Sequence, residues 1–158
     1  MMKDLEKISE LMIKNKFTLA IAESCTGGLI CHTVTNIPGS SAFFQMGIVS
    51  YSNTAKVNLL NVQRKTLHCH GAVSSQTAEE MAQGIRIKAG VDIGLSTTGI
   101  AGPGGGTPDK PVGLVYIALS DKKGTASYKY TFRGNRWENK ESTCQESLEL
   151  LIKYLLKQ

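Results

Sequence analysis

The sequence predicts an α/β protein built as a three-layer α/β/α sandwich, in which helices cover both faces of a β-sheet. Short apolar runs typical of buried strands alternate along the chain with amphipathic segments of helical period. The 158 residues are 41% hydrophobic and 20% charged, a composition that suffices for a packed core and is typical of folded rather than disordered chains. Neither an internal repeat nor a linker interrupts this pattern, so we expect residues 1–158 to form a single domain.

The first half of the chain is expected to alternate between helices and strands. A first amphipathic helix is predicted over residues 3–15, because one helical face collects Leu5, Ile8, Leu11 and Met12. The almost wholly apolar run 18–22 predicts a strand buried on both faces, followed by a helix from Thr26 to Thr35. Pro38 and Gly39 mark a turn. We then expect a strand over 43–51, a helix over 52–60 and one more helical turn over 64–68.

The second half begins with a helix and contains three further strands. Thr77 and Glu80 have the spacing of a capping box, which predicts the start of a helix with the apolar face Ala78, Met81, Ala82, Ile85 and Ala89. Strands are expected over 91–97 and over 112–119, and the long apolar run of the latter favours a central place in the sheet. A glycine-rich loop, 99–110, joins them.

The chain is expected to end in a strand and a long helix. A turn over 121–125 leads into a strand that alternates Tyr128, Tyr130 and Phe132 on one face. The helix over 136–156 is expected to turn inward Trp137, Cys144, Leu148, Leu151 and Leu155.

Charge and composition exclude several classes of function. Eighteen basic and thirteen acidic residues give a net charge of +5, which suits a small anionic ligand. The charges are dispersed and no motif reads bases, so no specific nucleic-acid partner is expected. No apolar run could cross a bilayer and the first residues are not a signal peptide, so we expect a cytoplasmic protein without a membrane partner. His68-Cys69-His70 lacks a second ligand cluster, so no metal is expected.

Three polar stretches could carry chemistry, and each follows a predicted strand. They cover residues 23–28, 51–56 and 97–106. Open α/β sheets bind ligands outside the carboxyl ends of their strands, so the three stretches would form one pocket if their strands end at the same edge. The glycine loop matches neither the P-loop nor the dinucleotide fingerprint, but successive N–H groups in it could still bind an anion.

Ser24 is a candidate nucleophile at the end of the first strand, where helix N-terminal N–H groups could hold an oxyanion. The alternative is that Ser24 or Thr26 only caps a helix. No histidine lies in the three stretches, so Lys56 is the better candidate base, if burial lowers its pKa. It could equally be an ordinary solvated lysine. Cys25 is a rival nucleophile, whose thiolate a helix N-terminus would favour, or else a small buried residue.

Several segments, in order, resemble the CinA C-terminal-domain family, which includes stand-alone nicotinamide-nucleotide amidases. They are AESCTGG, GSSAFFQMGIVSYSNTAK, GAVSSQTAEEMA, TTGIAGPGGG with KPVGLVYIAL, and FRGNR before the last helix. The resemblance spans nearly the whole chain. It implies cofactor-free hydrolysis of nicotinamide mononucleotide to nicotinate mononucleotide and ammonia, in pyridine-nucleotide recycling. Full-length members carry a larger N-terminal domain, whose activity we do not expect here, and a small metabolic enzyme of this kind is often a symmetric dimer.

The resemblance also implies roles for individual residues. Ser24 would be the nucleophile, Lys56 its base and Tyr51 a partner in the same hydrogen-bond network. Arg136 would face the anionic part of the nucleotide, and Lys140 stands where many relatives have a second arginine, which keeps the charge but loses the bidentate fork. Further substrate-binding candidates lie in the turn after the first strand and around the glycine loop: Glu23, Cys25, Thr26, Gly27, Thr98, Gly99, Gly102 and Gly104.

Overall fold

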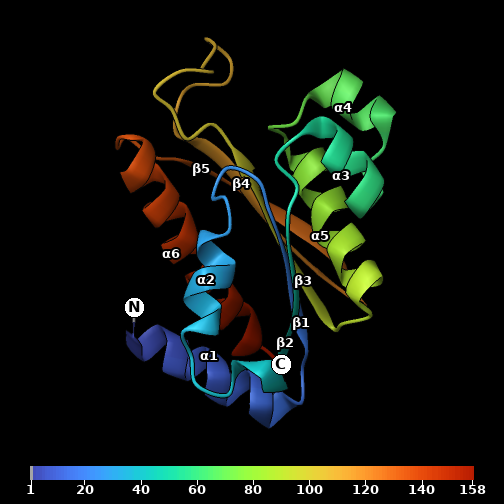
Figure 1. Cartoon of the computed structure of the whole chain (residues 1–158), viewed down its shortest axis with the longest axis vertical. Helices are drawn as coiled ribbons and strands as arrows, with labels where there is room; N and C mark the ends of the chain where they lie inside the picture. Colours follow the sequence, from blue (N-terminus) through green and yellow to red (C-terminus); the bar gives the residue numbers. More distant parts are fainter. Residues whose placement is uncertain (1) are drawn as a thin grey trace.

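The computed structural model describes residues 2–158 and has three layers, with helices on both sides of a central sheet (Figure 1). Helices α1, α2 and α6 cover one face, and α3, α4 and α5 cover the other. The predicted fold class is therefore confirmed. The elements are, in order, α1 (Met2–Asn15), β1 (Leu19–Glu23), α2 (Leu29–Thr35), a 3-10 turn (Ser40–Ala42), β2 (Phe44–Val49), α3 (Asn53–Leu60), α4 (Arg64–His70), α5 (Ser75–Ala89), β3 (Ile93–Gly99), β4 (Leu114–Asp121), β5 (Gly124–Thr131) and α6 (Arg136–Leu155).

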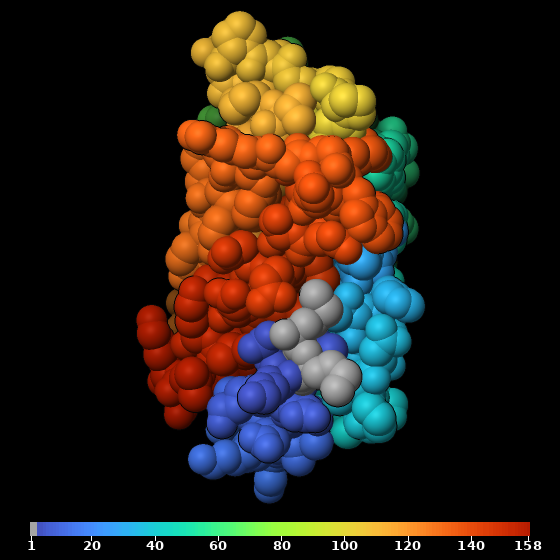
Figure 2. All heavy atoms as spheres, turned by 90° about the vertical axis from the view of Figure 1, so that its left-hand side faces the viewer, coloured from blue at the N-terminus to red at the C-terminus, as the bar shows by residue number. Residues whose placement is uncertain are grey.

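The sheet has five strands in the order β2-β1-β3-β4-β5, and its connections determine their directions. Strands β2, β1 and β3 are parallel, because helices provide the crossovers between them. A loop without a helix joins β3 to β4, and a tight hairpin joins β4 to β5, so both of these pairs are antiparallel. The carboxyl ends of the three parallel strands consequently meet at one edge of the sheet. The loop over residues 100–113, here called the glycine-rich loop, projects beyond this edge (Figures 1 and 2).

All five residues of β1 are buried, as its apolar sequence predicts. Leu19 and Ile21 belong to the core between the sheet and α1, α2 and α6. On the opposite face, Ala20 and Ala22 contribute to a core that includes Met81 and Ile85 of α5. Because alternate residues of a strand face opposite ways, β1 is held between two apolar layers, and the turn that follows it is fixed in place.

The helix after β1 begins three residues later than expected, at Leu29 rather than Thr26. Gly27 and Gly28 have φ values of 64° and 98°, a left-handed conformation that is costly for other residues. Residues 24–28 therefore form a turn between strand and helix. Smaller shifts occur at β3, which continues to Gly99, and at β4, which begins at Leu114 and lies between β3 and β5.

The expected capping box at Thr77 and Glu80 is wrong. The N-cap of α5 is Ser74, whose hydroxyl accepts from the Thr77 N–H at 3.2 Å. Glu80 accepts instead from Thr66 Oγ1 at 2.6 Å, which ties α5 to α4. The chain does contain a complete capping box, but it opens α6 at Asn135 and Glu138.

The inward orientation expected of Trp137 is also wrong, because its side chain is 60% exposed. Cys144, Leu148, Leu151 and Leu155 are buried as predicted. The first turn of α6 extends past this apolar core to the glycine-rich loop, where Asn139 is the buried residue and its Nδ2 donates to Ala101 O at 3.0 Å.

The prediction that Tyr128, Tyr130 and Phe132 lie on one face at β5 is confirmed for two of the three. Tyr130 and Phe132 pack against the core and stack on each other with ring centroids 5.8 Å apart, whereas Tyr128 is exposed. Among residues 2–158, no helix combines the length and the apolar character that crossing a bilayer requires.

Candidate active site

The three polar stretches converge on one cavity of about 280 Å³ at the carboxyl edge of the parallel strands. Each stretch follows one of these strands, so the parallel order of β2, β1 and β3 brings them together. We call this the catalytic cavity. It is lined by Ser24, Cys25, Tyr51, Asn53, Lys56, Ala72, Val73, Thr98, Gly99, Ile100, Ala101, Gly102, Gly104, Gly105 and Arg136.

Ser24 and Lys56 form a buried pair at the base of this cavity. The ammonium nitrogen Nζ of Lys56 lies 3.0 Å from Ser24 Oγ and donates to Ser50 O at 2.8 Å. The lysine side chain is only 1% exposed and has no ion pair within residues 2–158. Burial without a compensating negative charge disfavours the ammonium form, which lowers the pKa of Lys56 below its usual value of 10.5. The solvated-lysine alternative is therefore wrong.

Local structure explains why Lys56 points inward. Ser52 caps α3 by accepting from the Ala55 N–H at 3.0 Å, which begins the helix at Asn53 and places Lys56 at its fourth position. The segment before the cap is anchored to β1, because the Ser50 N–H donates to Glu23 O at 2.8 Å. The backbone oxygen that holds Lys56 is thus tied to the residue next to the nucleophile.

The turn after β1 is organised by Glu23, whose carboxylate is completely buried. One oxygen accepts from the N–H groups of Gly28 and Ile30 at 3.0 and 3.2 Å, and the other accepts from Cys31 N–H at 2.8 Å. A carboxylate at a helix N-terminus is favourable, and here it takes the N–H groups that the sequence suggested for a ligand. Within residues 2–158, the Cys25 and Thr26 N–H groups donate to no oxygen, and both interact with the Cys25 sulfur. Only Cys25 of the two lines the cavity, so its N–H is the oxyanion candidate of this turn.

Glu23, Thr26 and Gly27 were expected to bind substrate, but none of the three lines the catalytic cavity. Glu23 holds the start of α2 instead. Thr26 is completely buried, and its hydroxyl shares a 2.9 Å hydrogen bond with the hydroxyl of Thr97 on β3. Gly27 supplies the left-handed turn described above. These residues shape the turn around Ser24 and are not among the residues that line this cavity.

Cys25 borders the cavity but is not a poised thiolate. It is 7% exposed, and burial raises the pKa of its thiol to about 12. The expectation that a helix N-terminus would favour the thiolate is wrong, because α2 begins four residues later and Glu23 already occupies its N–H groups.

Thr98 and the glycine-rich loop form the wall opposite α3. Thr98 is buried, and its hydroxyl donates to Ala72 O at 2.7 Å, which joins β3 to the segment before α5. Gly99, Gly102 and Gly104, which the resemblance implies as substrate-binding residues, also line the cavity.

Arg136 closes the cavity from the first turn of α6. Its guanidinium donates to Gly102 O at 2.7 Å and to Tyr51 Oη at 2.9 Å, so one side chain joins the glycine-rich loop to the residue after β2. Lys140 does not line the catalytic cavity. It lies with Arg136 and Trp137 at an adjoining cavity of about 610 Å³. The two basic residues expected to bind the substrate phosphate are therefore distributed over two cavities that share Arg136.

Comparison with known proteins identifies the family. The model of the CinA C-terminal domain matches residues 2–155, which is almost the whole chain. The chain belongs to the CinA C-terminal domain family. A "CinA-like protein" of Geotalea uraniireducens is 51% identical over 149 residues, and a "putative competence-damage inducible protein" of Thermoanaerobacter pseudethanolicus is 49% identical over 151 residues. These alignments cover 94% and 96% of this chain but only 36% and 37% of the relatives, so the chain spans little more than a third of their length.

Solved structures of CinA proteins have the same fold along their whole length. A CinA superfamily protein of Klebsiella pneumoniae superposes with a TM-score of 0.95 at 30% identity, covering 99% of this chain and 98% of that one. A competence/damage-inducible protein of Agrobacterium tumefaciens superposes with a TM-score of 0.88 at 40% identity, covering 95% and 94%.

Sequence reasoning missed several residues that line the site in this CinA-family chain. Ala72 and Val73 reach the cavity from the segment before α5, and Asn53 reaches it from the first turn of α3. The Ser50 carbonyl also binds Lys56 Nζ. Asn53 could have been found, because it lies within the polar stretch 51–56, three residues before Lys56. Ala72, Val73 and a backbone oxygen carry no chemical signal of their own.

Within residues 2–158, the structure contains no cluster of side chains that could coordinate a metal ion. There, no group of three or more His, Cys, Asp or Glu side chains is placed to hold a cation. His68, Cys69 and His70 are exposed on α4.

Proposed function

We propose that the catalytic cavity hydrolyses the carboxamide of nicotinamide mononucleotide, giving nicotinate mononucleotide and ammonia through an acyl-enzyme on Ser24. The substrate is inferred from the resemblance to nicotinamide-nucleotide amidases, since the names of the relatives do not state a reaction. The observation that carries the reaction class is the 3.0 Å contact between Ser24 Oγ and the buried amine of Lys56. A serine becomes a nucleophile when an adjacent base can take its proton, and a desolvated lysine can do so.

The proposed first step uses the neutral amine of Lys56. Its lone pair takes the proton of Ser24 Oγ while Oγ attacks the carboxamide carbon, which forms a tetrahedral intermediate with a negatively charged oxygen. One N–H of Lys56 keeps its bond to Ser50 O, so the lone pair stays directed at Ser24. The N–H group of Cys25, which donates to no oxygen within residues 2–158, is the proposed oxyanion donor, and such a donor is worth roughly 3 kcal/mol in comparable sites.

The second half of the proposed reaction returns the proton. Lys56 protonates the leaving nitrogen as the carbon–nitrogen bond breaks, which releases ammonia and leaves an ester on Ser24. A water molecule then attacks the ester carbon and gives a proton to Lys56. That proton passes to Ser24 Oγ when the carbon–oxygen bond of the ester breaks, so the free enzyme is restored and nicotinate mononucleotide leaves.

Two alternatives make different predictions for the same assay. A nucleotide-binding module without catalysis would bind the mononucleotide and release no ammonia. A cysteine hydrolase would depend on Cys25, which its buried, protonated thiol disfavours. Incubating the purified chain with nicotinamide mononucleotide and measuring ammonia tests the proposal directly, and the absence of ammonia above a no-enzyme control would refute it.

Replacing Arg136 with alanine is expected to raise KM for the mononucleotide about 10- to 100-fold and to change kcat much less. A charge-assisted hydrogen bond is worth about 1.5–3 kcal/mol, and a phosphate contact is similar in the ground and transition states. Steady-state kinetics measure both constants. Arg133→Ala is the matched control, because Arg133 is an exposed arginine three residues earlier that does not line the cavity. An unchanged KM in Arg136→Ala would remove this residue from the substrate site.

Chelators are expected to leave the rate unchanged, because the proposed steps need only Ser24, Lys56 and backbone N–H groups. The measurement is ammonia release after incubation with EDTA and desalting. A loss of activity that added metal restores would mean that a metal takes part in the reaction.

A further inference from the structure

The cavity adjoining the catalytic one shares Arg136 with it but contains neither Ser24 nor Lys56, so the bond-breaking steps of the proposed hydrolysis do not take place there. It measures about 610 Å³, against about 280 Å³ for the catalytic cavity. We call it the Trp137 cavity. It is lined by Pro103, Val112, Gly134, Asn135, Arg136, Trp137 and Lys140. The volume falls within the range of small-molecule sites, about 300–1,000 Å³, and the mixture of apolar walls with a few polar groups is typical of them.

Trp137 is the only tryptophan of the chain, and 60% of its surface is exposed at this cavity. Neighbouring apolar groups in the wall are Pro103 and Val112. An exposed indole face beside apolar side chains is a surface on which a planar aromatic ring can stack. Any nucleobase can stack in this way, because every base has a π-face.

Two cations stand beside the indole. Lys140 Nζ lies 5.9 Å from the centre of the Trp137 ring, and Arg136 lines both the Trp137 cavity and the catalytic cavity. Within residues 2–158, neither of the two forms an ion pair. The first N–H groups of α6 do not provide the anion site, because Asn135 Oδ1 accepts from Trp137 N–H and Glu138 N–H. A ligand anion here would therefore be bound by the Arg136 and Lys140 side chains.

We propose that the Trp137 cavity binds a second nucleotide, with its base stacked on Trp137 and its phosphate between Lys140 and Arg136. An aromatic surface and two cations that form no ion pair within residues 2–158 match the two parts of a nucleotide, and neither feature alone would do so. Because Arg136 faces both cavities, the two ligands share one guanidinium. Nucleotide in the Trp137 cavity should therefore raise KM for the amide substrate.

Adenosine monophosphate is the probe, and calorimetry with the whole chain measures its affinity. Adenosine and ribose 5-phosphate each carry one half of the ligand and are expected to bind at least about 10-fold more weakly. Saturable binding should also quench the fluorescence of Trp137, which reports on this cavity alone because the chain has no other tryptophan. Binding without quenching would place the nucleotide elsewhere and overturn the proposal.

Two variants and their controls locate the site. Trp137→Leu should weaken the affinity for adenosine monophosphate, measured by calorimetry, roughly 5- to 100-fold, because stacking on an aromatic side chain contributes about 1–3 kcal/mol per base. Tyr128→Leu is its control, because Tyr128 is an exposed aromatic at a different cavity.

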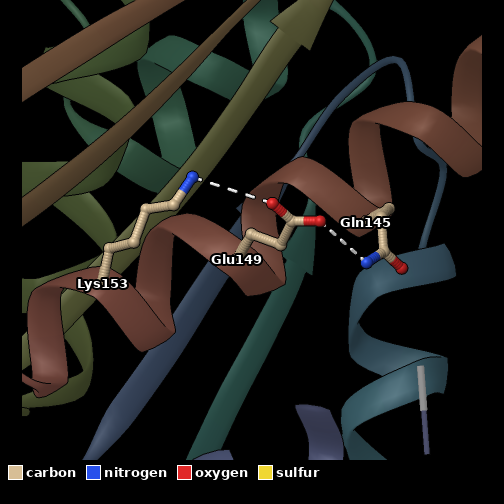
Figure 3. A network of polar contacts seen from close by, with 3 residues as sticks. All are labelled: Gln145, Glu149 and Lys153. Atoms are coloured by element: carbon tan, nitrogen blue, oxygen red, sulfur yellow. Dashed lines mark hydrogen bonds and ion pairs between the residues drawn. The ribbon is translucent and has the colours of Figure 1, made fainter.

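Lys140→Met should weaken binding of the monophosphate but not of adenosine. Its control is Lys153→Met on the same helix, where Lys153 pairs with Glu149 at 3.7 Å (Figure 3). If Trp137→Leu and Lys140→Met bind as the unmodified chain does, the proposal is wrong.

This inference stands apart from the proposed hydrolysis, and Ser24→Ala separates the two. The variant should lose ammonia release and keep adenosine monophosphate binding. Binding without any amidase activity in the unmodified chain would contradict only the proposed reaction. Ammonia release in a chain that does not bind the monophosphate would contradict only the Trp137 cavity.

Discussion

Ser24→Ala is expected to reduce ammonia release by at least roughly 10³-fold, whereas Cys25→Ala keeps most of the activity. Removing the nucleophile of a hydrolase leaves only binding and oxyanion stabilisation, which accounts for losses of this size or larger. Ser24 Oγ is the hydroxyl oxygen that Lys56 Nζ contacts, at 3.0 Å. Cys25 is a buried thiol whose pKa is raised to about 12, so it is almost wholly protonated at neutral pH.

The measurement is the initial rate of ammonia release for both variants, with circular dichroism to show that each is folded. Ser24 and Cys25 are neighbours of similar size and burial, so each variant is the matched control of the other. The reverse pattern, an inactive Cys25→Ala and an active Ser24→Ala, would establish a cysteine mechanism and exclude the proposed one.

Lys56→Arg is expected to be nearly inactive although it keeps the positive charge. A guanidinium cannot give up its proton under these conditions, so it cannot act as a base, and it must also fit a site in which the lysine is 1% exposed. In the unmodified chain, burial lowers the pKa of Lys56. The fraction of neutral amine, and with it kcat/KM, should therefore rise with pH through that lowered pKa.

The same shift makes a prediction about stability that does not depend on catalysis. Lys56 titrates at a lower pH in the folded chain than in the unfolded chain, so between these two pKa values the unfolded chain binds more protons. The free energy of unfolding contributed by this residue should therefore rise with pH across that window. Denaturant unfolding at several pH values, compared with Lys56→Met, measures this increment.

Substantial activity in Lys56→Arg would show that the residue acts through its charge or its packing alone. The base would then be sought elsewhere, and Tyr51 would be tested first. Its side chain lines the cavity and its hydroxyl accepts from Arg136 Nη2 at 2.9 Å, but within residues 2–158 no hydrogen bond joins it to Ser24 or Lys56.

Local sequence patterns were sufficient for the layers of the fold and for most of the candidate site. Strand β1 is apolar up to Glu23, and the polar stretches begin where the three parallel strands end, so the pattern placed Ser24 and Thr98 at strand ends. Their meeting at one edge was conditional on the strand order, which the structure provides. The resemblance pointed to Lys56 and Arg136, which the structure brings to the same cavity. Their roles in catalysis and binding remain predictions for the assays above.

Local patterns failed where a neighbour distant in sequence competes for the same group. Thr77 and Glu80 have capping-box spacing, but Glu80 binds Thr66 across the α4–α5 contact. The period of α6 placed Trp137 inward, but its side chain is 60% exposed, and the α6 residues in the apolar core begin at Cys144 among the residues described. Glu23 resembled a ligand-binding residue because it adjoins Ser24, and only the folded turn shows that its carboxylate binds the start of α2.

The sequence by itself determined where strands and helices alternate and which polar residues follow the strands, because hydrophobic period and turn residues act over a few positions. The tertiary structure decided which of those residues meet. Ser24 and Lys56 are 32 positions apart, and Tyr51 and Arg136 are 85 apart, so their contacts depend on the order of strands in the sheet. It also decided the protonation of Lys56, because a pKa depends on burial and neighbouring charges, and neither is encoded at a single position.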